Sequence, residues 1–241
     1  MNRETRGLLL GLVIGDGYVS MKRDHRYPTA LPSASLVVRH SAKQKAYAEH
    51  KASLVHKALG GKKPKVVEFN NNGYPGVRFT KTNKYFRIIR KRLYAGGEKV
   101  LTPKILDQLT EHSLALWWMD DGSLYMRRTK EGRVHGRQGV LSLYSPKQEA
   151  NLVRDWLVDK YGIQASVYPH KGRYRLSFGS SALRELITVI HPYVIPEMAH
   201  KIDMKYQRPS YQARVPGAAA APQGGWWLRY SPICGETRKW R

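Results

Sequence analysis

The chain has 241 residues, and its 41% hydrophobic content is enough for one large domain or two small ones. Lysine and arginine outnumber aspartate and glutamate by 42 to 18, and the resulting net charge of +24 indicates a polyanionic partner, above all nucleic acid. The single cysteine, Cys234, excludes an intramolecular disulfide and a cysteine-based zinc cluster. With no stretch approaching the ~20 apolar residues of a membrane helix, we expect an intracellular protein of the cytoplasm, nucleoid or organelle matrix, without membrane contact.

The first predicted element is an apolar helical run, LLGLVIGDG, from Leu9 to Gly17. It follows a basic N-terminus, as in a signal peptide, but its apolar part reaches only the lower length limit and no small-residue cleavage site follows. We therefore expect the run to belong to the fold. A second run of the same type, LALWWMDDG, spans Leu114 to Gly122 and also ends in Asp-Gly.

The same order of elements follows each run, which predicts an internal repeat. Ser41 opens SAKQ and Ser145 opens SPKQ, 25 and 24 residues after the respective aspartates, and both tetrapeptides have the pattern of a helix capping box. We expect a helix after each box, the second with Pro146 at its first position, ended by Gly60 and Gly162. Alternating residues predict strands at 17–22, 35–39, 65–69 and 74–80, and again at 122–127, 139–144, 164–170 and 173–178.

With a further helix at its end, each half has the order αββαββα. The first half is predicted to cover residues 1–97 and the second residues 98–205, with Gly96, Gly97 and Pro103 interrupting the helical pattern between them. Residues 206–241 are basic and rich in proline, glycine and alanine, and they lie outside the repeat. We expect this tail to be flexible and dispensable for activity.

The two runs resemble the paired motifs of single-chain LAGLIDADG homing endonucleases, whose second motif is commonly rich in tryptophan and ends in MDDG. The resemblance covers roughly residues 5–205. It implies an α+β fold in which two pseudo-symmetric halves form a saddle of antiparallel sheets, with the motif helices at the central interface. It also implies that a monomer cuts double-stranded DNA at a long asymmetric site, and that Asp16 and Asp121 bind metal and align water, one for each strand.

A physical argument supports the same pair of aspartates. Two motif helices packed side by side bring their last carboxylates together, and Gly11 and Gly15 permit a close approach. Neighbouring carboxylates are costly unless a cation neutralises them, and oxygen ligands beside DNA phosphates suit Mg²⁺. Gly15 and Asp120 are further candidate metal ligands, and Asp120 is a rival to Asp121 for this role.

The resemblance also aligns a lysine near the end of each half with an active-site lysine that polarises solvent. These are Lys99 and Lys201, which lie 83 and 80 residues after Asp16 and Asp121. DNA contacts are expected from the polar faces of the strands, where one side chain in two faces the same way. The candidate contact residues are Tyr18, Ser20, Lys22, Arg39, Arg78, Thr80, Arg127, Gln164, Ser166, Tyr168, His170, Arg173, Arg175 and Ser177.

Other chemistries match the sequence less well. Ser20 stands where a dinucleotide-binding loop needs its third glycine, and no P-loop follows Gly60 and Gly61. The ends of the chain lack the residues of protein splicing, so we expect a free-standing or intron-encoded product. Two alternatives to the endonuclease remain: an intron RNA maturase on the same fold, and a DNA-binding regulator that has lost catalysis.

Overall fold

The computed structural model describes residues 1–23, 25–26, 29, 31–128, 130–131 and 134–205. The candidate tail, residues 206–241, lies outside the described residues. One compact unit, Met1–Tyr206, holds both halves of the repeat. In the described part of the chain, no helix combines the length and the hydrophobicity needed to span a membrane.

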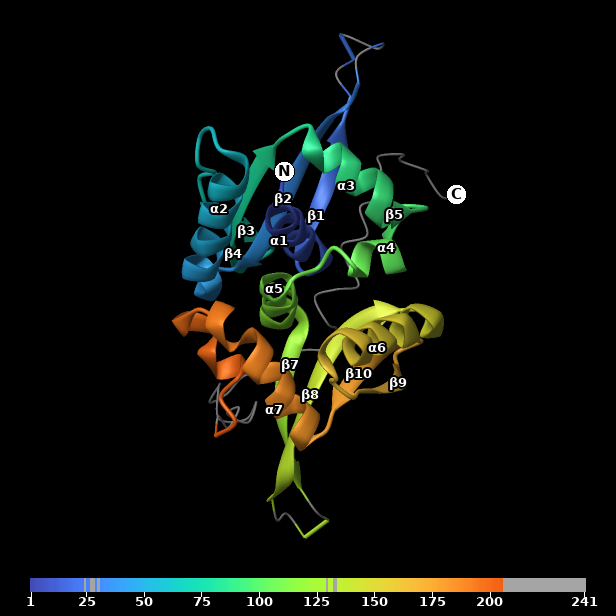
Figure 1. The fold of residues 1–241 in the computed structure, drawn as a ribbon. Helices are drawn as coiled ribbons and strands as arrows, with labels where there is room; N and C mark the ends of the chain where they lie inside the picture. The colour runs from blue at the N-terminus through green and yellow to red at the C-terminus, as the bar shows by residue number, and fades with distance from the viewer. Residues whose placement is uncertain (24, 27–28, 30, 129, 132–133, 206–241) are drawn as a thin grey trace, which may run out of the picture. The chain divides into compact units, whose positions relative to one another are not determined.

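The first half has the predicted order of elements (Figure 1). It consists of α1 (Arg3–Ile14), β1 (Gly17–Lys22), β2 (Ser33–Ser41), the 3-10 turn η1 (Ala42–Gln44), α2 (Lys45–Leu59), β3 (Val67–Asn71), β4 (Tyr74–Thr82) and α3 (Tyr85–Leu93). The four strands form an antiparallel sheet in the order β1-β2-β4-β3. Helices α2 and α3 pack against the sheet face that carries Val19, Leu36, Val38 and Phe79, all of them buried.

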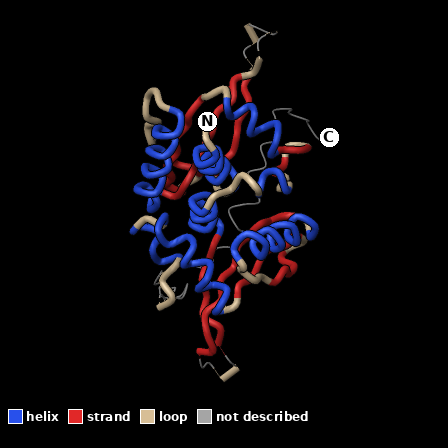
Figure 2. Tube along the Cα trace, in the orientation of Figure 1, coloured by secondary structure: helices blue, strands red, loops and turns tan. Residues whose placement is uncertain are grey.

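The second half repeats this arrangement. A short hairpin of β5 (Tyr94–Ala95) and β6 (Glu98–Lys99) and the helix α4 (Pro103–Leu106) lead into it. It then consists of α5 (Glu111–Asp121), β7 (Gly122–Arg128), β8 (Val134–Ser145), α6 (Lys147–Tyr161), β9 (Ser166–His170), β10 (Arg173–Phe178), α7 (Ser180–Ile190) and the 3-10 turns η2 (His191–Tyr193) and η3 (Pro196–Lys201). The sheet order β7-β8-β10-β9 is the same as in the first half, which confirms the predicted α+β repeat (Figure 2).

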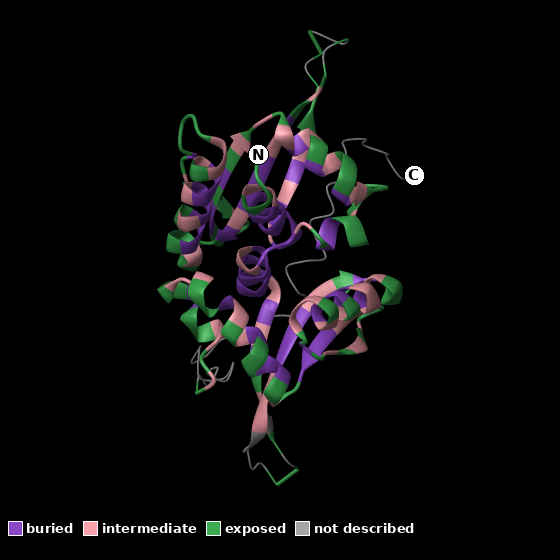
Figure 3. Cartoon of the chain, in the orientation of Figure 1, coloured by how far each residue is buried: buried purple, intermediate pink, exposed green. Residues whose placement is uncertain are grey.

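The motif helices α1 and α5 lie side by side between the two sheets (Figure 1). Glycines line the contact: a Cβ atom on Gly7 would lie 2.7 Å from the carbonyl oxygen of Gln108, and one on Gly11 would lie 2.7 Å from the Cα atom of Ser113. Only residues without side chains allow helices to approach this closely. Both helices are buried along nearly their whole length, which Figure 3 shows as a purple core at the centre.

The predicted capping boxes are wrong in detail. Ser41 is the last residue of β2 and pairs with Gly76, and a 3-10 turn separates it from α2. Ser145 likewise ends β8, opposite Tyr174, and Pro146 is the N-cap residue rather than the first residue of α6. Neither serine side chain forms a capping hydrogen bond to its helix: Ser41 precedes the 3-10 turn, and Ser145 lies one residue before the N-cap of α6.

The side-chain caps are on the motif helices instead. The Asn2 side chain accepts a hydrogen bond from the Thr5 amide at the start of α1, and Thr110 and Ser113 form a reciprocal capping box at the start of α5. The predicted helix ends are correct: Gly60 and Gly162 follow α2 and α6 with φ of 67° and 71°. Such positive φ values favour glycine.

Candidate active site

The two motif aspartates lie at the C-terminal ends of the paired helices. Asp16 follows α1 directly after its C-cap residue Gly15, and Asp121 is the last residue of α5. Both residues are half-buried, and the Asp16 side chain is only 12% exposed. Because α1 and α5 are adjacent, the structure brings together the two aspartates that the sequence singled out.

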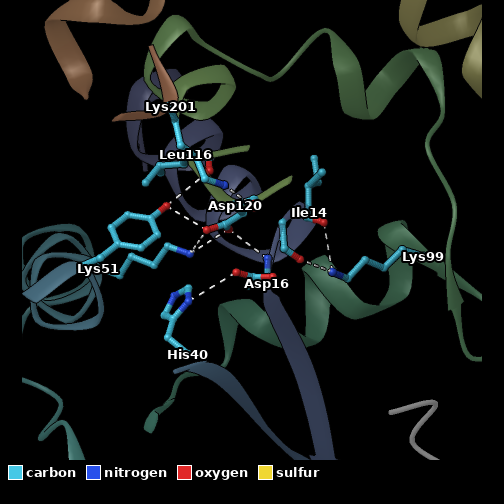
Figure 4. Close-up of polar contacts among 10 residues, drawn as sticks. Ile14, Asp16, His40, Lys51, Lys99, Leu116, Asp120 and Lys201 are labelled. Atoms are coloured by element: carbon cyan, nitrogen blue, oxygen red, sulfur yellow. Dashed lines mark hydrogen bonds and ion pairs between the residues drawn. The ribbon is translucent and has the colours of Figure 1, made fainter. Parts of the chain in front are cut away.

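The two predicted lysines reach the same helix ends. The Lys99 Nζ atom, from β6, donates to the carbonyl oxygens of Ile14 at 3.0 Å and Gly15 at 2.6 Å. The Lys201 Nζ atom, from the end of η3, donates to the carbonyl oxygen of Asp120 at 2.9 Å. Gly15 and Asp120 occupy the same position in the two motifs, so the lysine contacts obey the pseudo-symmetry of the repeat (Figure 4).

Burial dominates the electrostatics of the aspartates. It raises the pKa of Asp16 to about 7, and the neighbouring Asp120 carboxylate adds to this while Lys51, Lys201 and Lys99 oppose it. Burial also raises the pKa of Asp121 well above its usual range, with further contributions from Asp16 and Asp120. Burial lowers the pKa of Lys99 to about 8, although the aspartates oppose the shift. Negative charge is therefore crowded at this place and poorly solvated.

Asp120 has a different environment from the other two aspartates. Its Oδ1 atom accepts hydrogen bonds from the Tyr47 hydroxyl at 2.8 Å and from the Lys51 Nζ atom at 2.5 Å. Its Oδ2 atom accepts from the same Nζ atom at 2.7 Å and from the Asp16 amide at 2.9 Å. Although burial opposes ionisation, the Lys51 charge and the hydrogen bonds from Lys51 and the Asp16 amide hold the pKa of Asp120 below its usual value, so this carboxylate is charged.

A histidine that the sequence did not single out lies beside Asp16. The His40 Nδ1 atom, near the end of β2, is 3.4 Å from the Asp16 Oδ2 atom, and the His40 side chain is 1% exposed. Burial, together with the nearby Lys51, lowers the pKa of His40 to about 3, which keeps the imidazole neutral. A neutral ring nitrogen at this distance adds a potential ligand or hydrogen-bonding partner to the Asp16 side of the site.

The residues present fit a divalent cation. Asp16, His40 and Asp120 each offer a ligand atom, all within 4.8 Å of one another. The Asp16 Oδ1 atom is buried, and it has no hydrogen-bond partner among the described residues. A cation would satisfy this oxygen and offset the repulsion that raises the pKa values of Asp16 and Asp121.

The candidate DNA-contact residues of the first half share one sheet face. In the β1–β2 and β2–β4 registers, Ser20 lies opposite Ser35, and Arg39 lies opposite Arg78. The strand alternation places Tyr18, Lys22 and Thr80 on this same face, away from the core. Arg39 lies over the rings of Tyr18 and Phe69 at 5.8 and 6.0 Å, and these contacts hold its guanidinium on the surface.

The second sheet presents an equivalent polar face. His170, Tyr168 and Ser166 lie opposite Arg173, Arg175 and Ser177, respectively, in the β9–β10 register. Ser177 is buried and accepts a hydrogen bond from Gln138, so it contributes less polar surface than predicted. Gln164 is exposed and precedes β9, while the Arg127 side chain lies outside the described part of β7. Tyr125 and Gln138, which the sequence reasoning missed, pair with each other on the same face.

The sequence reasoning also missed Tyr47, Lys51 and His40. A signal for Lys51 was present, because Ala48, Lys51, Ala52 and Val55 follow one face of α2 at helical spacing. A lysine in an otherwise apolar stripe requires a buried anion as partner. No comparable signal marks His40, whose position depends on how β2 meets α1.

The comparisons with known proteins give one family match and several similar proteins. Residues 6–186 match the model of the LAGLIDADG DNA endonuclease family. Protein RecA of Mycobacterium gastri is 30% identical over 204 residues, which are 81% of this chain and 46% of that protein. The chain thus spans about half the length of this curated relative. The probable intron-encoded endonuclease 1 of Wickerhamomyces canadensis is 25% identical over 209 residues, which are 80% of this chain and 81% of that protein.

A solved structure shows the same fold. The homing endonuclease I-WcaI, bound to its DNA recognition sequence, aligns with a TM-score of 0.66 and 23% identity over 83% of this chain and 86% of that chain. The match to the family model covers most of the sequence. The internal repeat and the paired motif helices are consistent with this match. The chain belongs to the LAGLIDADG DNA endonuclease family.

Proposed function

We propose that the protein is a site-specific endonuclease that cuts both strands of double-stranded DNA with Mg²⁺ as its metal. The observation that carries the proposal is the placement of Asp16 and Asp121 at the adjacent ends of α1 and α5, each with a lysine at the same helix end. Buried carboxylates and cations at adjacent helix ends, beside basic and polar sheet faces, have the chemistry that a metal-dependent phosphodiesterase needs.

Each group of residues has a separate role in this reaction. The polar sheet faces hold the DNA backbone and base edges through side chains such as Arg39, Arg78 and Arg175. Asp16 and Asp121 would hold the metal, and the Gly15 carbonyl would supply a further oxygen. Bound Mg²⁺ would supply positive charge to the scissile phosphates and activate water. Lys99 and Lys201, fixed by helix-end carbonyls, add positive charge and orient solvent at the two sites.

The first test does not require the target sequence to be identified beforehand. The full chain is incubated with Mg²⁺ and a library of randomised duplexes, and the cut ends are sequenced. We expect one long asymmetric site with short 3′ overhangs. Uncut DNA at every salt and Mg²⁺ concentration would contradict the proposal and favour an RNA-binding maturase or a non-catalytic regulator.

Substitution of the aspartates then tests the site on the selected target. Asp16→Asn and Asp121→Asn each remove a charged ligand but preserve shape, so cleavage should fall at least 100-fold while DNA binding persists. Asp155→Asn is the matched control, because Asp155 is an exposed aspartate on α6 that pairs with Arg154 and does not belong to either motif. Normal cleavage by both motif variants would show that the two aspartates do not belong to the active site.

A further inference from the structure

The Asp120 carboxylate has no free acceptor position for a metal. An ionised carboxylate offers about four lone-pair sites on two oxygens. All four are used: Oδ1 accepts from Tyr47 and Lys51, and Oδ2 accepts from Lys51 and the Asp16 amide, at distances between 2.5 and 2.9 Å. A metal ion could bind Asp120 only if it displaced the buried lysine or the Asp16 amide.

The partner of Asp120 comes from the other half of the repeat. Lys51 lies on α2 and its side chain is fully buried, as is the side chain of Asp120 on α5. The Lys51 ammonium also lies 4.4 Å from the centre of the Tyr47 ring, which packs on the same side. Loss of either charge would leave the other buried without compensation, so the two residues form a single unit across the helix pair.

This unit exists on one side of the pseudo-twofold axis only. In the two motifs Asp120 corresponds to Gly15, and in the two helices Lys51 corresponds to Val153, because each lies nine residues before the glycine that ends its helix. The symmetry-related place therefore holds a glycine and a valine, with neither charge. Gly15 itself accommodates the carboxylate: a Cβ atom there would lie 2.1 Å from the Asp120 Oδ2 atom.

We propose that Asp120 is a positioning residue rather than a metal ligand, and that it holds the backbone of Asp16 in place from the opposite helix through its hydrogen bond to the Asp16 amide. Lys51 and Tyr47 fix the carboxylate in the required orientation. The Asp121 backbone has no equivalent partner, because Gly15 has no side chain. The two half-sites are therefore unequal, and loss of the Asp120 contact should impair the Asp16 half-site more. This inference on cleavage rests on the proposed function.

Two double variants isolate the contact. Lys51→Met with Asp120→Asn removes both charges but leaves an amide oxygen that can accept from the Asp16 amide. Lys51→Met with Asp120→Leu removes the charges and the acceptor, and leucine has as many side-chain heavy atoms as aspartate. Both avoid the unpaired buried charge that either single charge deletion would leave. Melting temperature and circular dichroism establish that each variant is folded.

The first measurement is hydrogen exchange of the Asp16 amide, by NMR, in the absence of metal and DNA. We expect the Asn variant to retain the protection of this amide against exchange. In the Leu variant, the protection factor of the amide should fall at least tenfold. The second measurement is strand-resolved cleavage of a duplex labelled at both ends. The Leu variant should cut one strand at least tenfold more slowly relative to the other, and the Asn variant should restore nearly equal rates.

Three results distinguish a failure of the positioning role from a failure of the proposed function. Unchanged Asp16 protection in the Leu variant would overturn the positioning role. A tenfold loss of Mg²⁺ affinity in the Asn variant, measured from thermal stabilisation of the free chain, would make Asp120 a metal ligand and also overturn it. Wild-type protein that cuts no DNA would contradict the proposed function, yet the exchange measurement would still test the contact. If the Leu variant does not fold, Lys51→Met with Asp120→Ser is measured instead, since the shorter side chain cannot reach the Asp16 amide.

Discussion

At the scale of single residues, burial determines the protonation of the motif aspartates. The pKa of Asp16, raised by burial to about 7, exceeds its ordinary value of 3.8, so the folded protein binds this proton more tightly than the unfolded chain does. The corresponding contribution to stability is present below about pH 4 and is lost as the pH rises through about 7. A bound cation reverses this loss, because it stabilises the ionised form.

Asp16→Asn should therefore change stability in a pH-dependent way. Without metal, the melting temperature of the variant relative to wild type should rise between pH 5 and pH 8, because the variant has no carboxylate to ionise. Added Mg²⁺ should shrink this difference at pH 8 by stabilising only the wild type. Differential scanning fluorimetry of both proteins measures the effect. A difference that stays constant with pH would show that the Asp16 carboxyl titrates normally.

The two lysines at the helix ends also lead to a residue-scale prediction. Lys99→Met and Lys201→Met should each reduce the cleavage rate at least tenfold with little effect on DNA affinity, because both ammonium groups lie beside the aspartates. Lys81→Met is the matched control. The Lys81 Nζ atom donates to the carbonyl oxygens of Gly60 and Lys62 at the end of α2, away from the motif helices. Equal losses of cleavage rate in all three variants would indicate that Lys99 and Lys201 only cap the helix ends and have no direct role in cleavage.

At the scale of elements, the glycines of α1 determine how closely the motif helices pack. Gly11→Ala gains about 1 kcal/mol in helix propensity. It also places a methyl group 2.7 Å from the backbone of Ser113, and overpacking of this kind costs about 1–3 kcal/mol. Because backbone cannot rotate away, we expect net destabilisation of up to about 2 kcal/mol in urea unfolding. A more stable variant would contradict the close packing.

Gly179→Ala is the control for this substitution. Gly179 precedes α7 with φ of −66°, and a Cβ atom there would meet nothing within 4 Å. Because Gly179 is the N-cap residue of α7, alanine there should cost less than about 1 kcal/mol. The comparison separates crowding at the helix pair from the general effect of replacing glycine in or beside a helix.

Most elements could be predicted from the sequence, because their periodicity is local. The strands at residues 17–22 and 173–178 match β1 and β10, and the glycine stops of α2 and α6 are correct. Helices follow both boxes as predicted, but the capping boxes were wrong, since Ser41 and Ser145 remain paired in their sheets and their side chains form no cap. Pairing between strands is not local, so the SAKQ and SPKQ patterns could not reveal it.

At the scale of the whole molecule, the net charge of +24 should dominate affinity. The logarithm of the DNA association constant should fall with the logarithm of salt concentration by about 0.9 per phosphate neutralised. Arg78→Ala should reduce this slope by about one, because Arg78 is exposed on the polar face of the first sheet. Arg184→Ala, on the exposed side of α7, should leave it unchanged. A slope near zero for wild type would contradict binding through the sheets.

The candidate site was predictable only in its repeated part. Asp16 and Asp121 recur in both halves, so alignment of the halves finds them, and the family resemblance adds Lys99 and Lys201. Tyr47, Lys51 and His40 have no counterpart of the same kind, because the contacts to Asp120 and Asp16 break the symmetry. Their role depends on three-dimensional packing between α2, β2 and the motif helices. The residue spacing within one half gives no information about this packing.

The pairing of Lys51 with Asp120 has a consequence for how the two halves recognise each other. If two copies of the first half associated through their motif helices, Lys51 would face Gly15 and remain a buried cation without a partner. Two copies of the second half would place Asp120 against Val153 and bury an anion alone. Each self-association carries the cost of an uncompensated charge, whereas the mixed pair carries none. The ion pair thus makes the two halves specific for each other, and a symmetric pair of either half would form without this cost only if the charged residue were replaced.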